Sequence, residues 1–388
     1  MPWTRRHTLT AAIFLAAGLA GCANLGYYWP SVNGHLLLLN AARPVQDWLD
    51  DAHTPATLKA RLALAQRIRR FAVSELKLPD NPSYQRYADL RRSAVVWNVV
   101  AAPALSLTLK TWCFPLAGCV GYRGYFQEAE ARAEAAQLAA LGLETSVYGV
   151  PAYSTLGWLN WAGGDPLLST FIGYPEGELA RLVFHELAHQ VVYAPGDTAF
   201  NESFATAVER LGVQRWLQDP ASPTSSAARQ AYLQFDERRQ QFRALTAATR
   251  QELSRIYESN TALAQDPRTQ AAHKTIAIQA FRDAYAQLKA GWDGYAGYDP
   301  WVARANNASF GAQAAYDEGV PAFEALFERE GRDWQRFYQA VRQLAELPAA
   351  QRHAALSISP RPAAGDLRQA PAMRCAPQAG SACRGSEK

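Results

Sequence analysis

The sequence predicts an α+β fold that is predominantly helical, with a small sheet in the first half and a helical C-terminal half. Three observations support this prediction. Between 94 and 122, β-branched and aromatic residues are interrupted by Pro and Gly, which is typical of short strands. From 223 to 346, apolar residues recur at helical spacing almost throughout. Residues 177–217 indicate two helices that are joined by a tight turn.

The individual elements follow from local patterns. Apolar residues at helical spacing with basic residues between them predict an amphipathic helix over 55–77. The small sheet should occupy 94–160, with a Glu- and Ala-rich helix over 125–141 and an extended segment over 145–161. Further helices are expected at 227–258, 267–289, 301–317, 321–330 and 333–346. The first two of these should form a protruding hairpin arm, for which we favour structural packing over partner binding.

Composition and charge describe a folded globular chain. Its 388 residues are 49% hydrophobic, enough to bury a large core in one domain or two coupled ones, and we expect the folded domain to span 55–350. The 39 basic and 35 acidic residues give a net charge of only +4. Because this balance comes without a basic stripe, we expect no nucleic-acid partner.

The N-terminus has the features of a targeting signal. Arg5 and Arg6 precede an apolar stretch that is too short to span a bilayer, so residues 1–21 are predicted to be a signal peptide. Leu-Ala-Gly-Cys22 is typical of a bacterial lipobox, in which the cysteine becomes the first residue and carries lipid. The alternatives are an ordinary signal peptide with a chance cysteine, and export by the twin-arginine route.

The segments around the folded domain follow from this interpretation. Residues 22–54 are expected to be a lipidated tether and lead-in, and 358–388, rich in Pro, Ala, Gly and Ser, a poorly ordered tail. Ala23, where an aspartate would favour the inner membrane, predicts a lipid anchor in the outer membrane that faces the periplasm.

Four cysteines remain besides Cys22. Cys113 and Cys119 lie six positions apart, and Cys375 and Cys383 lie eight apart. In an oxidising compartment, such local pairs predict two short-loop disulfides. A metal site is less favoured because the spacing is not the two-residue type and no histidine lies nearby.

The most informative motif is His-Glu-Leu-Ala-His at 185–189. Histidines four positions apart lie on one helix face, so both imidazoles can point at one ion. Pro and Gly at 195–196 end this helix, and Asp197 can cap the next one, predicted over about 199–217. That helix carries Glu202 in its first turn, and the tight turn should return it to the histidines.

These residues have the types that a single Zn²⁺ requires. Zinc takes two imidazoles and one carboxylate and keeps a fourth position open. We expect His185, His189 and Glu202 to be the ligands, and Glu186 to act as a general base without being a ligand. The alternative is that all of them are ordinary polar residues on solvated helices.

Two resemblances to known families add to this pattern. The segment Asn201-Glu202-Ser203-Phe204-Ala205 resembles Asn-Glu-Gly-Phe-Ala of the gluzincin aminopeptidases, in which the glutamate is the third zinc ligand. Over roughly 22–350, the chain resembles the bacterial predicted aminopeptidase lipoproteins. The segments that carry this second resemblance, besides the zinc motif, are Cys113-Phe114-Pro115, Tyr122-Arg123-Gly124-Tyr125-Phe126, Ala152-Tyr153-Ser154-Thr155-Leu156-Gly157 and Asn306-Asn307-Ala308.

The resemblance implies a zincin-like metallopeptidase core and a zinc-dependent peptidase of the cell envelope, acting on peptide or protein substrates as an aminopeptidase. The chain differs from the better-known enzymes in its spacer of 12 residues between His189 and Glu202, which is shorter than theirs, and in the absence of a Gly-Ala-Met-Glu-Asn segment. The resemblance therefore supports recognition of the substrate's free amino end less strongly than it supports the metal chemistry. A zinc endopeptidase and a non-catalytic lipoprotein scaffold remain alternatives, and the intact Glu186 argues against the scaffold.

Hydrolysis also needs a donor for the oxyanion, which a tyrosine or histidine supplies in similar enzymes. Tyr316 follows Asn306-Asn307-Ala308 in a late predicted helix and is the first candidate, with Tyr298 and His273 as alternatives. For each of them, a packing or surface role is the competing interpretation.

Other residues are candidates for supporting roles. Tyr153 begins a segment that resembles an edge strand for substrate pairing, and Asn307 is a second candidate for substrate contact. Glu209 lies seven residues after Glu202 on the same helix face. It either orients a ligand histidine or is an ordinary surface residue.

Overall fold

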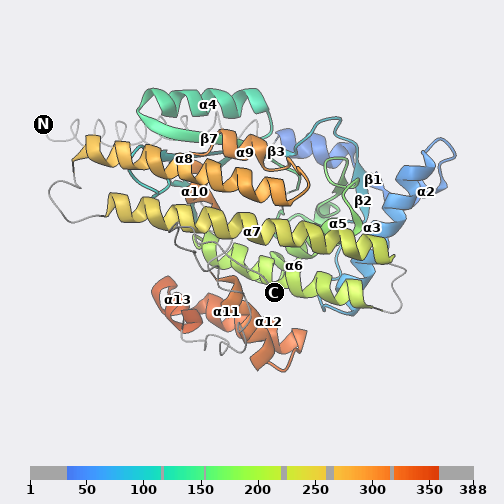
Figure 1. The fold of residues 1–388 in the computed structure, drawn as a ribbon. Coiled ribbons are helices and arrows are strands. Elements are labelled where there is room, and N and C mark those ends of the chain that lie inside the picture. The colour runs from blue at the N-terminus through green and yellow to red at the C-terminus, as the bar shows by residue number, and fades with distance from the viewer. Residues whose placement is uncertain are drawn as a thin grey trace, which may run out of the picture.

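The computed structural model describes residues 33–114, 118–152, 154–219, 225–258, 266–314 and 319–357. The fold is α+β and predominantly helical, as predicted (Figure 1). A helix occupies 33–41. The other elements are β1 (Arg43–Pro44), α2 (Val45–Asp50), α3 (Ala56–Ser74), β2 (Arg86–Ala88), β3 (Val96–Pro103), β4 (Trp112–Phe114), β5 (Gly118–Val120), β6 (Arg123–Tyr125), α4 (Glu128–Ala140), β7 (Leu143–Val150), η1 (Asn160–Ala162), β8 (Leu167–Leu168), α5 (Glu176–Ala188), α6 (Thr198–Gln218), α7 (Ser226–Tyr257), α8 (Pro267–Gly291), α9 (Asp299–Ala303), α10 (Asn307–Ala314), α11 (Val320–Arg329), α12 (Trp334–Glu346) and α13 (Ala349–Ser357).

The central sheet is antiparallel, in the order β6-β3-β7. Side chains alternate along β3 because a strand has a two-residue period. Trp97, Val99 and Ala101 pack against α4, which covers one face of the sheet (Figure 1). On the other face, Val100 and Ala102 contact Ala308 of α10. One face of the sheet is therefore sealed by α4, and the other faces the interior of the molecule.

The predicted extended segment over 145–161 is only half correct. The strand β7 ends at Val150, and turns and the short helix η1 follow. Leu156, Gly157, Gly163 and Gly164 all have positive φ, a conformation that cannot continue a strand. A short sheet of β1, β2 and β8 and the β4-β5 hairpin complete the strand structure of the described residues.

The two helices of the His-Glu-Leu-Ala-His region form where the sequence predicts them. In α5, Leu179, Val183, Phe184 and Leu187 are fully buried in the main core with α3 and α6. The side chain of Asp197 accepts a hydrogen bond from the amide of Phe200 and so caps α6. The stripe of apolar residues on α5 thus leaves its opposite face for polar side chains.

The predicted hairpin arm exists, but it packs along the molecule rather than protruding from it. Helices α7 and α8 lie side by side across the width of the molecule (Figure 1). Phe242 of α7 stacks on Tyr298 and anchors a second core with α8, α9 and α10. Arg239 of α7 forms an ion pair with Glu178 of α5, so the arm is attached to the helix that carries the histidines.

The predicted helix over 301–317 is divided into α9 and α10. The Asn306 side chain accepts from the amide of Ser309, and the Ser309 hydroxyl accepts from the amide of Asn306. This reciprocal pair is a helix start, which explains the break. Below α6 in Figure 1, α11, α12 and α13 cover its outer side.

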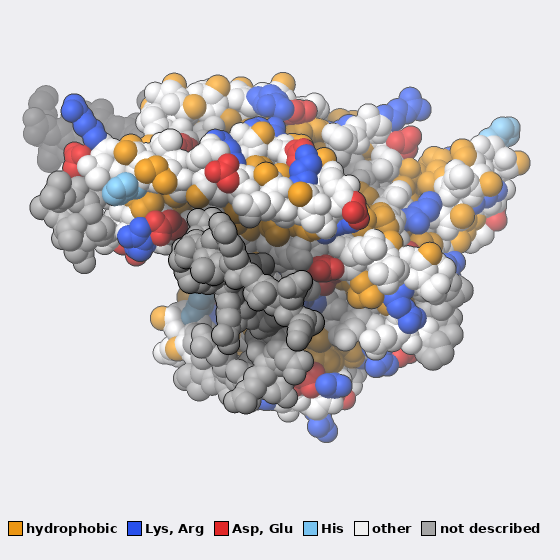
Figure 2. Space-filling view, in the orientation of Figure 1, with side chains coloured by type: hydrophobic (Ala, Val, Ile, Leu, Met, Phe, Trp, Pro, Cys, Tyr) orange, Lys and Arg blue, Asp and Glu red, His pale blue; other side chains and the backbone are white. Residues whose placement is uncertain are grey.

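Two further properties concern the surface. Basic and acidic side chains are interspersed over the face in Figure 2. Within the described part of the chain, no helix combines the length and apolar character that crossing a bilayer requires.

Candidate metal centre and active-site cleft

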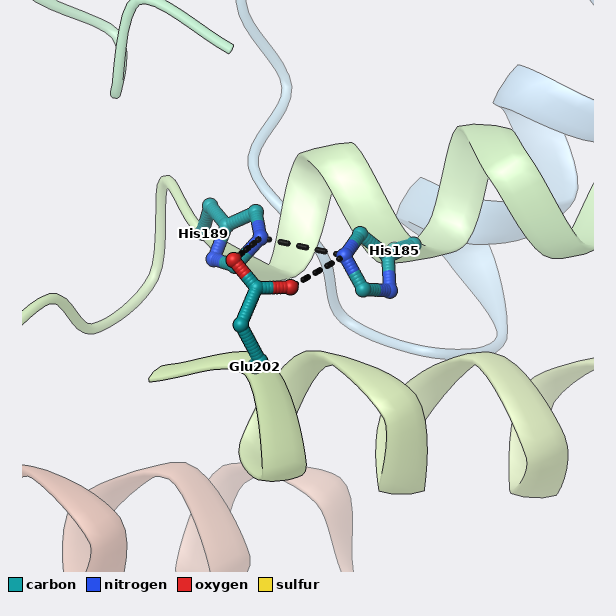
Figure 3. A group of neighbouring side chains, drawn as sticks. All are labelled: His185, His189 and Glu202. Carbon is teal, nitrogen blue, oxygen red and sulfur yellow. Dashed lines mark hydrogen bonds and ion pairs between the residues drawn. The ribbon is translucent and has the colours of Figure 1, made fainter. Parts of the chain in front are cut away.

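Helices α5 and α6 bring the three predicted ligands together. His185 projects from the last turn of α5, His189 caps the C-terminal end of that helix, and Glu202 rises from the start of α6 between them (Figure 3). Nε2 of His185 lies 3.1 Å from Nε2 of His189 and 3.3 Å from Oε2 of Glu202. Nε2 of His189 lies 3.8 Å from Oε1 of Glu202. The three side chains therefore present one nitrogen or oxygen atom each to a common point.

These separations fit a small divalent cation. Ligands held about 2.0–2.1 Å from a tetrahedral ion lie roughly 3.3–3.4 Å from one another. The three observed ligand separations, 3.1, 3.3 and 3.8 Å, bracket that value. Two imidazoles and one carboxylate suit Zn²⁺ and leave one tetrahedral position for water or substrate. The residues present thus match the requirements of a zinc site that is open on one side.

Glu209 orients the His185 side chain. Its Oε2 lies 3.0 Å from Nδ1 of His185, and its Oε1 accepts from Arg181 at 3.0 Å. Burial would raise the pKa of Glu209, but Arg181 and His185 outweigh it and lower the pKa to about 2. The ionised carboxylate accepts a hydrogen bond from Nδ1–H of His185, which leaves Nε2 as the atom that could bind a metal. Of the two alternatives for Glu209, the structure supports the orienting one.

The two histidines experience different environments. Burial lowers the pKa of His189 to about 4, which keeps this ring neutral, the form that binds metal. Burial also disfavours a charged His185, yet hydrogen bonds with Glu202 and Glu209 raise its pKa to about 10. The two carboxylates thus create a position that favours positive charge.

Glu186 lines the same cavity as the ligands. Its pKa is raised to about 7, mainly by burial and further by the charges of Glu202 and Asp165. A carboxylate with a pKa near neutrality can accept and return a proton efficiently. Glu186 therefore lies beside the three candidate ligands with a proton affinity that suits proton transfer near neutral pH.

A polar network supports the loop beside Glu186. Asp165, 4% exposed, accepts hydrogen bonds from the amide of Thr155, the hydroxyl of Ser154 and Nε2 of Gln190. Gln190 follows the second histidine directly and also donates to the hydroxyl of Ser83. This network fixes the 154–157 loop, whose residues Ser154 and Leu156 line the cavity.

The cavity has a volume of about 530 Å³ and collects residues from distant parts of the sequence. Val96 and Asn98 of β3 and Gly124 of β6 contribute to its wall, so the sheet lies next to the metal centre. Arg243 enters from α7. The size is within the range of small-ligand pockets, roughly 300–1,000 Å³.

The β4-β5 hairpin forms another part of this wall. Cys113 and Cys119 form the predicted disulfide, and Phe114 and Val120 beside them line the cavity. Gly118 has φ +75°, and a Cβ there would lie 2.7 Å from the backbone nitrogen of Gly196. Only glycine therefore allows this hairpin to pack so closely against the turn between α5 and α6.

Several predicted residues lie outside the described residues: Cys22, Tyr153, Tyr316, Cys375 and Cys383. Of the alternatives to Tyr316, Tyr298 stacks in the second core and His273 is exposed on α8, so neither lines the cavity. Asn307 is fully buried, where its side chain donates to the carbonyl oxygens of Pro103 and Ala104 and accepts from Tyr257. In this position it joins α10 to β3 and has no surface to offer a substrate.

Two tyrosines of the cavity were not predicted. Tyr122 and Tyr193 both line it, and burial together with the Glu202 carboxylate raises the pKa of each, so both phenols keep their protons. Tyr122 also lies within the electrostatic reach of Glu186. Tyr122 belongs to one of the segments that carry the family resemblance, but the sequence assigns it no role because no local spacing connects it to the histidines.

Comparison with known proteins adds one finding. Neither the curated proteins nor the solved structures include a match to this chain. The family described as "Putative aminopeptidase" matches residues 26–356, which include the strands, the metal helices and the second core. With this match over most of its length, the chain belongs to that aminopeptidase family.

Proposed function

We propose that this protein is a zinc-dependent peptidase of the cell envelope, and that it acts as an aminopeptidase. One observation carries the proposal: two imidazoles and a carboxylate converge, with their ligand atoms within 4.8 Å of one another, in a cavity that Glu186 also lines. Membership of the aminopeptidase family supports peptide-bond hydrolysis as the reaction.

The geometry supports a separate role for each of these residues in the proposed reaction. When bound to His185, His189 and Glu202, Zn²⁺ would polarise a carbonyl and lower the pKa of water. Glu186 takes a proton from the attacking water and passes it to the departing amine. Glu209 holds His185 in the orientation that presents Nε2. The chain itself thus supplies ligands, a proton carrier and a fixed ligand orientation.

We also propose Tyr122 as a donor to the oxyanion that develops on the substrate carbonyl. Its phenol keeps its proton, lines the cavity and is close enough to Glu202 and Glu186 to experience their charges. A protonated phenol can donate a hydrogen bond to negative charge as it forms. Tyr193, which shares these properties, is the second candidate, and Tyr316 stays a prediction from the sequence.

The test of the function combines metal analysis with a peptide library. The purified protein should contain one Zn²⁺ per chain and hydrolyse peptides, and removal of the metal should abolish turnover until zinc is restored. Glu186→Gln should retain zinc and lose hydrolysis. Turnover at the wild-type rate in Glu186→Gln, or hydrolysis that survives complete metal removal, would contradict the proposal.

A zinc endopeptidase is the second candidate, and one observation favours it. Among the described residues that line the cavity, the acidic ones are Glu186, Glu202 and Glu209, and all three have roles at the metal centre. An aminopeptidase needs a further anionic group for the substrate amine. Matched peptides with free and N-acetylated ends distinguish the two: an aminopeptidase cleaves only the free ones, an endopeptidase both.

The envelope location rests on the sequence of the N-terminal segment. We propose that Cys22 carries lipid and that the protein is anchored in the outer membrane, facing the periplasm. Radiolabelled fatty acid should be incorporated into the wild type but not into Cys22→Ser. The Cys22→Ser protein should also shift from the membrane fraction to the soluble fraction.

A further inference from the structure

A second cavity adjoins the metal cleft. It measures about 290 Å³, and Arg243 of α7 lines both it and the larger cavity. Its other walls come from β7, from the end of α9 and from α10. Tyr148 of β7, which lines the second cavity, is also close enough to Glu202 for that carboxylate to contribute to its raised pKa of about 12, after the larger effect of burial. The two spaces therefore share Arg243, and we call the smaller one the annex.

The annex has a basic and aromatic lining. Its described lining residues include two arginines, Arg243 and Arg304, and the aromatic side chains of Tyr148 and Trp301. None of these described lining residues is acidic. The guanidinium of Arg304 makes one polar contact among the described residues, from its Nε to the carbonyl oxygen of Pro300 at 3.0 Å. Its remaining N–H groups can therefore bind a ligand.

The platform around these arginines is rigid. Trp301 packs edge-on against Phe310 at 5.3 Å and Phe242 at 5.4 Å between ring centroids. Arg304 ends the short helix that starts from this aromatic cluster. Because packed rings fix the backbone that carries Arg304, a ligand has to order the arginine side chain but not the helix.

We propose that the annex is a substrate subsite that binds a carboxylate of the peptide while the scissile bond lies at the metal centre. This inference rests on the proposed peptidase function. Guanidinium groups present parallel N–H donors that match the two oxygens of a carboxylate. The carboxylate can be the C-terminus of a short peptide or an acidic side chain near the cleavage point. The protein would then prefer peptides that carry negative charge on one side of the scissile bond.

The experiment measures binding, so that it does not depend on turnover. Full-length Glu186→Gln protein is titrated by calorimetry with tetra-alanine and with its C-terminal amide. A second pair, Ala-Ala-Glu-Ala amide and Ala-Ala-Gln-Ala amide, tests whether an acidic side chain supplies the carboxylate that binds. In at least one pair, the carboxylate form should bind about tenfold tighter, as expected for one charge-assisted hydrogen bond.

Two further variants assign the preference to the annex. Arg304→Gln, made in the Glu186→Gln protein, should remove the preference for the carboxylate and leave the affinity for the uncharged peptide unchanged. Arg282→Gln, on the exposed side of α8, removes the same charge elsewhere and should leave the preference intact. Because Arg304 is exposed and lies outside the metal cleft, its substitution should not disturb folding or metal content.

The possible outcomes are distinct. Equal affinity for both members of both pairs would overturn the inference, as would a preference that survives both Arg304→Gln and Arg243→Gln. If the wild type hydrolyses none of the peptides but the preference depends on Arg304, the annex stands and the peptidase proposal fails. If hydrolysis occurs without any preference for the carboxylate, the peptidase proposal stands and the annex proposal fails.

Discussion

At the scale of single residues, the side chains next to the ligands have the clearest experimental consequences. Glu209 is 3% exposed, accepts from Arg181 and faces Nδ1 of His185. It can therefore fix the orientation of His185 while remaining outside the cluster of His185, His189 and Glu202. Removal of its charge therefore changes the affinity for metal rather than the identity of the ligands.

Glu209→Gln should lower the affinity for zinc about 10- to 100-fold, the usual cost of losing a partner of a ligand histidine. Competition with a chromogenic chelator measures this change. Glu324→Gln is the control, because Glu324 also pairs with an arginine, Arg210 at 3.3 Å, but does not line the cavity. Equal zinc affinity in wild type and Glu209→Gln would remove the orienting role.

Tyr122→Phe should reduce kcat about 10²-fold, the effect of losing one oxyanion donor, and change KM and zinc content little. Steady-state kinetics with one peptide measures the two parameters separately. Tyr125→Phe is the control, because Tyr125 is on the same strand region but packs with the cluster under α4. An unchanged kcat in Tyr122→Phe would show that Tyr122 is not the hydrogen-bond donor to the oxyanion.

At the scale of elements, the start of α6 determines where Glu202 lies. Asp197 caps this helix and forms a buried ion pair with Arg352 of α13, and His353 contacts the same carboxylate oxygen at 2.8 Å. Helix α13 is thus connected to the helix that carries Glu202. Loss of Asp197 would remove the cap and leave the buried guanidinium without its counter-charge.

Asp197→Ala should therefore lower the free energy of unfolding by about 3–5 kcal/mol, the cost of stranding one member of a buried pair. Asp333→Ala, which removes the exposed cap of α12, should cost only about 1 kcal/mol. Urea denaturation monitored by circular dichroism gives both values. Similar losses in the two variants would show that the ion pair contributes nothing beyond the cap.

The same carboxylate predicts a pH dependence. Burial raises the pKa of Asp197, but its hydrogen bonds with His353, Phe200 and Arg352 outweigh burial, and the net pKa is lowered. Because the pKa of Asp197 is lower in the folded state, its ionised carboxylate stabilises the protein at pH values above the unfolded-state pKa of about 3.9. This stabilisation is lost as the pH falls through the folded-state pKa. The difference in unfolding free energy between wild type and Asp197→Ala should therefore shrink in acid and remain constant above about pH 5. Denaturation at a series of pH values measures it.

Elements were predictable where their determinants are local. The helices α3, α5, α7 and α8 follow from apolar periodicity, and the proximity of His185 and His189 follows from their spacing of four residues. The break between α9 and α10 was missed, although Asn306 and Ser309 carry a capping signal in the sequence. Short strands such as β1 and β8 left no signal, because two residues have no periodicity to detect.

At the scale of the whole molecule, the cleft depends on segments that are distant in sequence. The sheet, the disulfide hairpin, α5, α6 and α7 all contribute to it. Asn98, Tyr122 and Arg243 line one cavity, but no local pattern connects them. The sequence therefore predicted that His185, His189 and Glu202 lie together, whereas the walls of the cleft required the tertiary structure.

The β4-β5 hairpin has a consequence for how the protein is made. Its disulfide lies between two residues of the cavity wall, and Gly118 packs it against the turn that joins the metal helices. We expect closure of this disulfide to affect the wall of the cavity more than the cluster of His185, His189 and Glu202, because both cysteines lie in the hairpin and outside α5 and α6. Protein produced under reducing conditions should therefore bind zinc as the oxidised protein does but hydrolyse peptides more slowly.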